Sequence, residues 1–403
     1  MTFEIAISGL NAASKQLEVI SNNIANNTTT GFKSSRAEFH DVYAATTKHA
    51  TGQGVGVSDI RQTFTPGNYT DTVKALDLSV TGTGFFKVVK EGEVNYTRNG
   101  TFQLDREGFI VNATGHALNG YPAVGDGFLA PTVGKLQVDP ADLSPNATEI
   151  IELGLNLDAT LEVLPPFDPN DPETYNSTAA TTIYDSLGSP NTLAMYYHKD
   201  TPNTWSMYSF VDGVEVNQPG GDELVFTTEG DLAAVNGAPA LSLTLPTFTP
   251  ATGGSPMSLE LSIENLTQYN GNFGINQIVQ DGYTNGRLND IKIEDDGTIM
   301  GLYSNGQTET MGQVALTNFS NLDGLAQVYG TSWRETYASG AALTGKPGTA
   351  SLGGIRSGAL EDSNVDITSE LVAMITAQRS FQANAQVITT ADTINQTVIS
   401  MRR

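Results

Sequence analysis

The two ends of this chain carry the same spacing of apolar side chains, and this pattern limits the available folds more than any other feature. Near the N-terminus, apolar or small residues alternate spacings of three and four at Phe3, Ala6, Leu10, Ala13, Leu17, Ile20 and Ile24. Near the C-terminus, the same pattern passes through Ile367, Leu371, Met374, Gln378, Phe381, Ala385 and Ile388. Such heptad spacing predicts helices that pack along an apolar seam. Both ends are therefore predicted to be long amphipathic helices.

The faces of these segments that lie opposite the seam carry few charges. Within residues 3–24 only Glu4, Lys15 and Glu18 are charged. A helix that faces solvent normally has a charged back, and an isolated helix of about twenty residues is only marginally stable in water. A back of Asn, Gln, Ser and small side chains suits contact with neighbours on several sides. We therefore expect the terminal helices to form a coiled-coil-like core in an assembly of many copies.

The overall charge excludes two classes of partner. The chain has 20 Lys and Arg against 44 Asp and Glu, a formal net charge of −24. Nucleic acids and anionic membrane surfaces are bound by clustered Lys and Arg, so we expect neither as a partner. The chain contains no cysteine, which excludes disulfides and thiolate chemistry.

The N-terminus is a poor secretory signal. Glu4 precedes any basic residue, and Ser8 and Asn11 interrupt the first apolar stretch. No run of about eighteen consecutive apolar residues predicts a membrane-spanning helix. We expect no membrane insertion, and a chain that is either cytoplasmic or exported without cleavage of a signal peptide.

The middle of the chain is predicted to be β structure. Residues 71–143 and 287–357 contain short alternating runs and are assigned to one discontinuous β domain. The predicted turns are Asn99-Gly100, which is a strong hairpin signal, Asp296-Gly297 and Asn305-Gly306. Residues 33–70 connect this domain to the first helix. The predicted fold class is mainly β and multidomain, with terminal helices in residues 1–32 and 358–403 and nested, discontinuous all-β domains between them.

Residues 144–286 are predicted to be a separate, acidic, all-β domain inserted into the first. Between Lys135 and Arg287 the only lysine or arginine is Lys199, whereas carboxylates recur throughout. Asp168, Asp171 and Glu173 could chelate calcium weakly, but a solvated acidic loop is the favoured interpretation because prolines surround them. Like-charge repulsion places such a domain on the outside of any assembly.

Residues with catalytic or metal-binding chemistry show no informative spacing. The four histidines, none at a metal-ligand spacing from another, are His40, His49, His116 and His198. The chain has no G-x-S-x-G, H-E-x-x-H or P-loop motif. We expect no enzymatic activity, no cofactor and no bound metal.

Two long segments resemble a known family. Residues 8–33, SGLNAASKQLEVISNNIANNTTTGFK, are similar to the N-terminal signature of the bacterial flagellar axial proteins, which form the rod, the hook and the hook–filament junction. Residues 358–392, GALEDSNVDITSELVAMITAQRSFQANAQVITTAD, resemble their C-terminal signature. LDLSVTGTGFFKV and YTRNGTFQLDREGFIVNATGHALNGYPA resemble the β region shared by rod and hook subunits. GQVALTNFSNLDGLAQVYGTSWRETYASG and TIYDSLGSPN resemble hook segments, and the similarity is weakest over residues 143–272.

This resemblance implies a structural subunit of the hook, which self-assembles into a curved, flexible tube that couples the motor rod to the filament and transmits torque. The implied partners are other copies of the chain, the distal rod protein, the hook–filament junction proteins, the hook cap protein and the flagellar type III export apparatus. The implied location is the extracellular part of the flagellum, reached without a cleaved signal peptide. A distal rod or junction subunit of the same family is an alternative.

The segment that follows the first helix is expected to link the inner tube to the outer β domains. Thr28, Thr29 and Thr30 are β-branched and disfavour helix continuation, Gly31 can adopt a positive φ, and Phe32 can anchor the exit. The Asn side chains would bond to the backbone and to neighbouring subunits without adding charge. The candidate assembly residues are Phe3, Leu10, Leu17, Ile20, Asn22, Asn23, Ile24, Asn26, Gly31, Phe32, Leu371, Met374, Phe381, Ala385 and Ile388.

A different class of function also fits the heptads. The chain could be a secreted binding protein in which the acidic β domain holds a ligand and the terminal helices only dimerise. Helices without a charged back, together with similarity along nearly the whole chain, favour the structural subunit.

Overall fold

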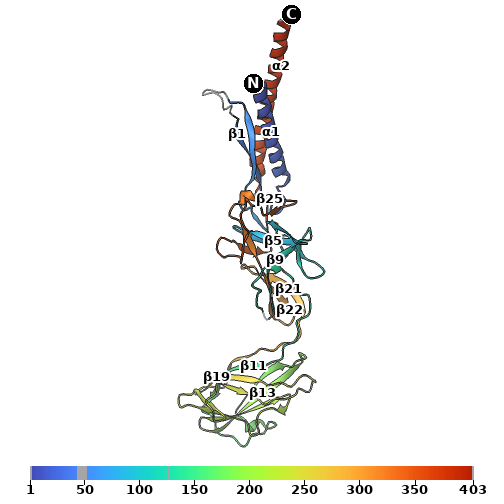
Figure 1. The fold of residues 1–403 in the computed structure, drawn as a ribbon. Coiled ribbons are helices and arrows are strands. Elements are labelled where there is room, and N and C mark those ends of the chain that lie inside the picture. Colours follow the sequence, from blue (N-terminus) through green and yellow to red (C-terminus); the bar gives the residue numbers. More distant parts are fainter. Residues whose placement is uncertain (1, 43–51, 126, 402–403) are drawn as a thin grey trace. The chain divides into compact units, whose positions relative to one another are not determined.

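The computed structural model describes residues 2–42, 52–125 and 127–401 and divides into two compact units (Figure 1). The first, here called the core unit, comprises residues 1–140, 290–302 and 308–403, and the second, the insert unit, comprises residues 141–289 and 303–307. The chain is mainly β with a long helix near each terminus, so the predicted fold class is confirmed. His49 lies outside the described residues.

The two helices of the core unit, α1 (Thr2–Ala25) and α2 (Ile367–Met401), pack side by side. A Cβ at Gly9 would lie 2.8 Å from the amide of Asn384, and Asn23 contacts Glu370 through a 2.9 Å hydrogen bond. Gly9 lies beside Asn384 whereas Asn23 lies beside Glu370, so residue numbers increase along α1 as they decrease along α2. The two helices are therefore antiparallel. Figure 1 shows both chain ends at the same end of the pair, where α2 extends beyond α1.

The predicted seam is only partly buried within one chain, where its members Ala6, Ala13 and Ile20 are buried. Phe3 and Leu371, both predicted in the seam, are 47% and 46% exposed, and Ile367 is also exposed. The buried residues of α1 are Ala6, Ala12, Ala13, Val19, Ile20 and Asn23, and the one buried residue among the described part of α2 is Ala377. Alanines thus make up much of the buried surface of the two helices, while many of the larger apolar residues stay exposed.

Strands β1 (Ser35–Asp41) and β2 (Val55–Gln62) form a two-stranded antiparallel sheet that contacts α1. The backbone amide of Val55 donates to Oγ of Ser8 at 3.2 Å. Residues 33–70, predicted to connect the first helix to the β domain, thus contain a two-stranded sheet that packs beside that helix.

The main sheet of the core unit has 13 strands, ordered β21-β22-β23-β9-β5-β6-β26-β25 along its main path. These strands are β21 (Leu288–Ile293), β22 (Thr298–Tyr303), β23 (Thr308–Val314), β9 (Ala117–Pro122), β5 (Phe85–Lys90), β6 (Glu93–Thr97), β26 (Ser332–Arg334) and β25 (Ala326–Gln327). The remaining ones are β7 (Phe102–Leu104), β8 (Ile110–Asn112), β10 (Gly134–Lys135), β24 (Leu316–Asn318) and β27 (Leu343–Gly345). A short 3-10 helix, η2, spans Leu322–Gly324. Part of the core of this unit is filled by aromatic rings that pack edge to face, those of Phe64, Phe85, Tyr96, Phe319 and Trp333.

Two of the three predicted turns are confirmed. Gly297 and Gly306 have φ of 81° and 84°, and each amide closes a turn onto the residue three positions earlier. The hairpin predicted at Asn99-Gly100 is wrong, because β6 pairs with β5 and β26 whereas β7 pairs with β8. Gly100 instead lies against the backbone of Leu78, where a Cβ would meet its carbonyl oxygen at 1.6 Å.

Two small sheets lie where the β part of the core unit meets the helices. Strand β28 (Gly354–Ser357) pairs with β4 (Leu78–Thr81), and β29 (Ala359–Glu361) pairs with β3 (Tyr69–Asp71), both antiparallel. The segment that leads into α2 is therefore hydrogen-bonded to segments that follow α1.

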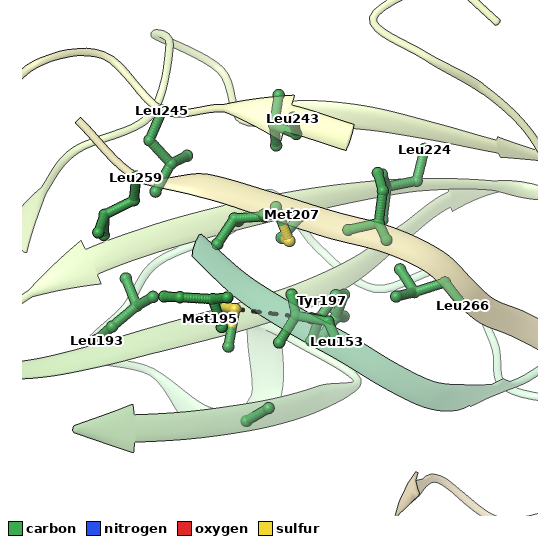
Figure 2. Close-up of a cluster of buried hydrophobic side chains, with 14 of the residues drawn as sticks. Leu153, Leu193, Met195, Tyr197, Met207, Leu224, Leu243, Leu245, Leu259 and Leu266 are labelled. Atoms are coloured by element: carbon green, nitrogen blue, oxygen red, sulfur yellow. Dashed lines mark hydrogen bonds between the residues drawn. The ribbon is translucent and has the colours of Figure 1, made fainter. Parts of the chain in front are cut away.

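The insert unit contains two sheets that share one hydrophobic core (Figure 2). One is six-stranded, made of β12 (Ser177–Tyr184), β13 (Pro190–Thr201), β14 (Thr204–Val211), β15 (Val214–Glu215), β16 (Asp222–Phe226) and β17 (Leu232–Val235). The other is four-stranded, made of β18 (Ser242–Thr244), β19 (Glu260–Tyr269), β11 (Ile150–Asp158) and β20 (Gly274–Gln280). A 3-10 helix, η1, spans Pro172–Thr174. Along β13, Leu193, Met195 and Tyr197 point into the core with no exposed surface, as period-two alternation requires.

Lys199 is buried in the insert unit. Its Nζ donates to the carbonyl oxygens of Ala159 and Leu161 at 2.7 and 2.8 Å and lies 5.7 Å from the ring centre of Trp205. Lys199 is 7% exposed. The one lysine of this stretch thus anchors the loop of Ala159 and Leu161 to the fold.

Candidate assembly interface

Asn23, near the end of α1, connects three elements. Its Nδ2 donates to Oε1 of Glu370 at 2.9 Å and to the carbonyl oxygen of Ser35 at 2.8 Å. Its Oδ1 accepts from the backbone amide of Ser35 at 2.9 Å. These three hydrogen bonds join α1, α2 and β1 within one chain. Asn23 is only 1% exposed, so they are shielded from water.

The other predicted Asn residues shape the exit from α1. Asn26 Nδ2 donates to the carbonyl oxygen of Asn22 at 2.9 Å, and its Oδ1 accepts from Thr29 Oγ1 at 3.2 Å. Asn22 itself is exposed. These bonds replace helix hydrogen bonds as the helix ends.

Gly31 turns the chain away from the helix. Its φ is 69°, which confirms the predicted positive value. A Cβ here would lie 2.6 Å from the backbone nitrogen of Asn99, so the position has no room for a side chain. The amide of Gly31 donates to the carbonyl oxygen of Glu361 at 2.7 Å, and Phe32 is buried beside it.

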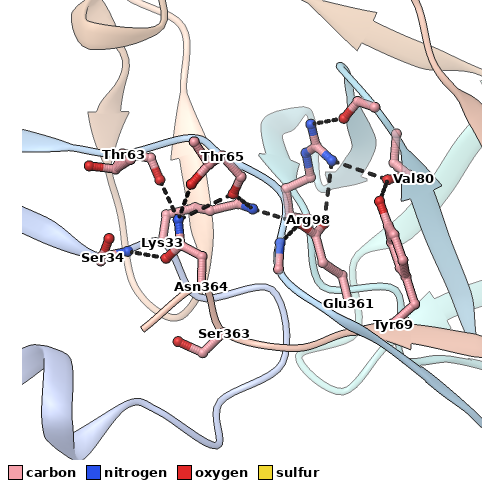
Figure 3. A network of polar contacts seen from close by, with 12 residues as sticks. Lys33, Ser34, Thr63, Thr65, Tyr69, Val80, Arg98, Glu361, Ser363 and Asn364 are labelled. Atoms are coloured by element: carbon pink, nitrogen blue, oxygen red, sulfur yellow. Dashed lines mark hydrogen bonds and ion pairs between the residues drawn. The ribbon is translucent and has the colours of Figure 1, made fainter. Parts of the chain in front are cut away.

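Glu361 lies between two cationic side chains at this point (Figure 3). Its Oε1 is 2.6 Å from Nζ of Lys33, and its Oε2 is 3.3 Å from Nη1 of Arg98. The side chains of Lys33 and Glu361 have no exposed surface, and that of Arg98 is 3% exposed. We call these three residues the junction triad.

Backbone groups complete the coordination of the junction triad. Lys33 Nζ also donates to the carbonyl oxygen of Thr65 at 2.8 Å, and Arg98 Nη2 donates to that of Gly82 at 2.7 Å. The amide of Gly67 donates to Oε1 of Glu361 at 3.0 Å. Burial lowers the pKa of Lys33 and that of Arg98, and the charge of Glu361 opposes this in both cases.

The junction triad was missed from the sequence. Glu361 lies 328 positions after Lys33 and 263 positions after Arg98 in the sequence. No spacing rule relates residues so far apart. The one signal in the sequence was that each residue lies inside a segment that resembles a family motif.

The remaining candidate residues divide by exposure. Leu10, Leu17 and Ile24 on α1, and Met374, Phe381, Ala385 and Ile388 on α2, are half-buried, whereas Ile20 is buried. Phe3 and Leu371 are exposed. Within one chain the half-buried residues are partly covered, and the exposed ones are left uncovered.

Large apolar side chains are exposed along much of α2. Those more than about a third exposed are Ile367, Leu371, Val372, Ile375, Val387, Ile394, Val398, Ile399 and Met401. Phe3, Ile5 and Ile7 add to them on α1. An exposed apolar surface of this extent is typical of a site of protein association.

The acidic and histidine side chains of residues 2–42, 52–125 and 127–401 form no metal site. No group of three or more His, Asp or Glu side chains there is placed to hold a metal ion. Asp168 and Asp171 accept hydrogen bonds from amides of their own loop. No helix in the same residues is long and apolar enough to cross a membrane.

Models of four protein families match successive parts of the chain. They are the flagella basal body rod protein over residues 3–33, the flagellar hook protein FlgE/F/G D1 domain over 79–151, the flagellar basal body protein FlaE D2 domain over 156–283 and the flagellar basal body rod FlgEFG protein C-terminal region over 356–401. The flagellar hook protein FlgE of Escherichia coli strain K12 is 40% identical over 417 residues and is aligned over 100% of both chains. The chain belongs to the flagellar hook protein family.

Other members of the flagellar hook protein family are similar over nearly their full length. FlgE of Salmonella typhimurium strain LT2 is 39% identical over 100% of both chains, and that of Borreliella burgdorferi is 33% identical over 98% of both. The crystal structure of Helicobacter pylori flagellar hook protein FlgE2 matches with a TM-score of 0.56 at 14% identity, over 71% of this chain and 99% of that one. At that identity the match supports the fold. As a member of this family, the chain is a structural hook subunit.

Proposed function

We propose that copies of this chain polymerise through their terminal helices into the curved, flexible tube of the hook, which joins the motor rod to the filament and transmits torque. The exposed apolar surface of α2 carries this proposal. Side chains such as Val387 and Ile394 are 47% and 57% exposed in one chain, and burial of this remaining surface between copies would stabilise a polymer by about 1 kcal/mol each.

The candidate assembly residues take different parts in this proposal. Phe3 and Leu371 are exposed and would contact neighbouring copies. Leu17 and Phe381 would hold the two helices of one chain together, so that the pair enters the tube as a unit. Asn23, Gly31 and Phe32 would fix the exit towards the β structure.

Further partners and the location follow from membership of the family and are proposals for this chain. The ends of the tube would contact the distal rod protein and the hook–filament junction proteins, and a hook cap protein would cover it during growth. The chain would leave the cell through the flagellar type III export apparatus with its N-terminus uncleaved and would function outside the cell. It would have no enzymatic activity.

The experiment compares two substitutions of the same chemistry. Val387→Asp places a charge on the exposed face of α2, and Leu187→Asp places one on the insert unit, where Leu187 is 61% exposed. Purified variants are examined by circular dichroism for folding and by electron microscopy for tubes. We expect folded chains in both cases, and tubes only with Leu187→Asp, because a charge buried between copies is costly.

The outcome also separates the proposal from a dimerised binding protein. Wild-type chains that give only dimers under all ionic conditions would favour the binding protein. Tubes formed equally well by Val387→Asp and the wild type would remove α2 from the interface.

A further inference from the structure

The junction triad lies where both connections between the helices and the β structure pass. Lys33 lies eight positions after the end of α1 at Ala25, and Glu361 lies six positions before the start of α2 at Ile367. Arg98 directly follows β6. One carboxylate therefore contacts the outgoing link, the returning link and the β structure.

The same place is also held by uncharged contacts. The backbone amide of Ser34 donates to Oδ1 of Asn364 at 2.7 Å, and Nδ2 of Asn364 donates to the carbonyl oxygen of Thr63 at 2.7 Å. The carbonyl oxygen of Glu361 accepts from the amide of Gly31. These bonds, with the β29–β3 pairing, tie the two links together without any charge.

Stability alone does not account for a buried charge cluster here. Removing ions from water costs several kcal/mol each, and replacing a buried ion pair with well-packed apolar residues is often neutral or stabilising. The lowered pKa of Lys33 reflects this cost of burial. Two cations facing one carboxylate also leave an excess positive charge in the interior.

A charge cluster of this kind differs from an apolar contact in its directionality. Apolar side chains pack in several orientations of similar energy, whereas the two oxygens of a carboxylate fix the positions of two donors at once. At a junction through which both links pass, this constraint acts on the direction of the helices.

We propose that Glu361 is a positioning residue that sets the angle at which the helical pair leaves the β structure, and thereby sets the curvature and bending stiffness of the assembled tube. The proposal rests on the proposed function, because curvature is a property of the polymer. It does not assign the ability to polymerise to Glu361, and Glu361→Gln, which leaves two buried cations without their counter-charge, should also lower the stability of the folded chain.

The test uses the full-length chain in three forms. Glu361→Gln keeps the shape of the side chain and removes its charge. Asp362→Asn makes the same chemical change at the next position, where the carboxylate accepts from Thr70 Oγ1 at 2.7 Å outside the junction triad. A third variant, called the triple-Met form, combines Lys33→Met, Arg98→Met and Glu361→Met. It removes all three charges and fills the same buried space with apolar side chains.

The readouts are the curvature distribution and persistence length of tubes in electron micrographs, and the unfolding midpoint of the chain. We expect Glu361→Gln and the triple-Met form to assemble into tubes whose curvature and stiffness both shift from wild type. Asp362→Asn should retain the wild-type values. The triple-Met form should fold but unfold at a lower midpoint than the wild type, because the carbonyl oxygens of Thr65 and Gly82 and the amide of Gly67 lose their partners.

Three results would overturn the proposal. Tubes of wild-type shape from either Glu361→Gln or the triple-Met form would show that the charges do not set the angle. Folded chains of both variants that form no tubes would place the junction triad in the assembly contacts. Chains of both variants that fail to fold would make it a stability element. Failure of the wild type itself to form tubes would count against the proposed function instead.

Discussion

The amide of Asn23, in the last turns of α1, donates a 2.9 Å hydrogen bond to the carboxylate of Glu370, in the first turn of α2, across a separation of 347 positions. The bond sets the antiparallel register of the helices at the end nearest the β structure. Through Ser35, the same side chain also fixes the start of β1.

Asn23→Asp should weaken this arrangement. The new carboxylate would face that of Glu370 and could not donate to Ser35, and each unsatisfied buried polar group costs about 1–3 kcal/mol. We expect the assembled tubes to dissociate at a lower temperature, measured by light scattering. Asn22→Asp, which adds the same charge at an exposed position, is the control and should have a much smaller effect.

Gly31→Ala should destabilise the core unit beyond the cost of its backbone conformation. A positive φ costs a residue other than glycine about 1–2 kcal/mol, and the added methyl group would also clash with the backbone of Asn99 at 2.6 Å. Gly92→Ala is the matched control, since Gly92 has a φ of 87° and an added methyl group there would meet no atom of the described residues within 4 Å. Urea unfolding should show a clearly larger loss for Gly31→Ala, and equal losses would disprove the clash.

Tyr96→Phe should change the response of stability to alkaline pH. Burial, reinforced by Glu335, raises the pKa of Tyr96 from 10.0 to about 12. The unfolded chain loses this proton above about pH 10 while the folded chain keeps it, so stability falls as pH rises from 10 to 12. The difference is on the order of 2 kcal/mol. Unfolding measured from pH 8 to 12 should show a flatter decline in the variant, and parallel curves would contradict the assignment.

Replacing residues 144–286 with a short Gly/Ser linker should leave a chain that still forms tubes. The ends of the insert are already adjacent, because the amide of Leu143 donates to the carbonyl oxygen of Gly286 at 2.7 Å. We propose that this acidic unit lies on the outside of the tube, where charge repulsion between copies is screened over about 8 Å at 0.15 M salt. Electron microscopy across a salt series should show straighter or less stable tubes with an altered salt response. A folded, exported variant that forms no tubes would place the insert in the core contacts.

Local features were predictable because they depend on residues close together in the chain. The heptad spacing around Leu17 and Phe381 marks helices, and Asn305-Gly306 marks a turn whatever surrounds it. Gly31, after three β-branched threonines, takes the positive φ expected of a helix exit. The scarcity of basic residues between Lys135 and Arg287 likewise sets the charge of the insert without reference to its fold.

The tertiary structure alone decided which distant groups meet. Heptad periodicity identifies an apolar face but leaves open which neighbour covers it, and in one chain Phe3 and Leu371 stay exposed. Asn99-Gly100 forms no hairpin, because β6 pairs with β5 and β26 while β7 pairs with β8. The contact of Lys33 and Arg98 with Glu361 depends on β29 returning beside β3, and the pairing energy of buried charges depends on distance in space rather than on separation along the chain.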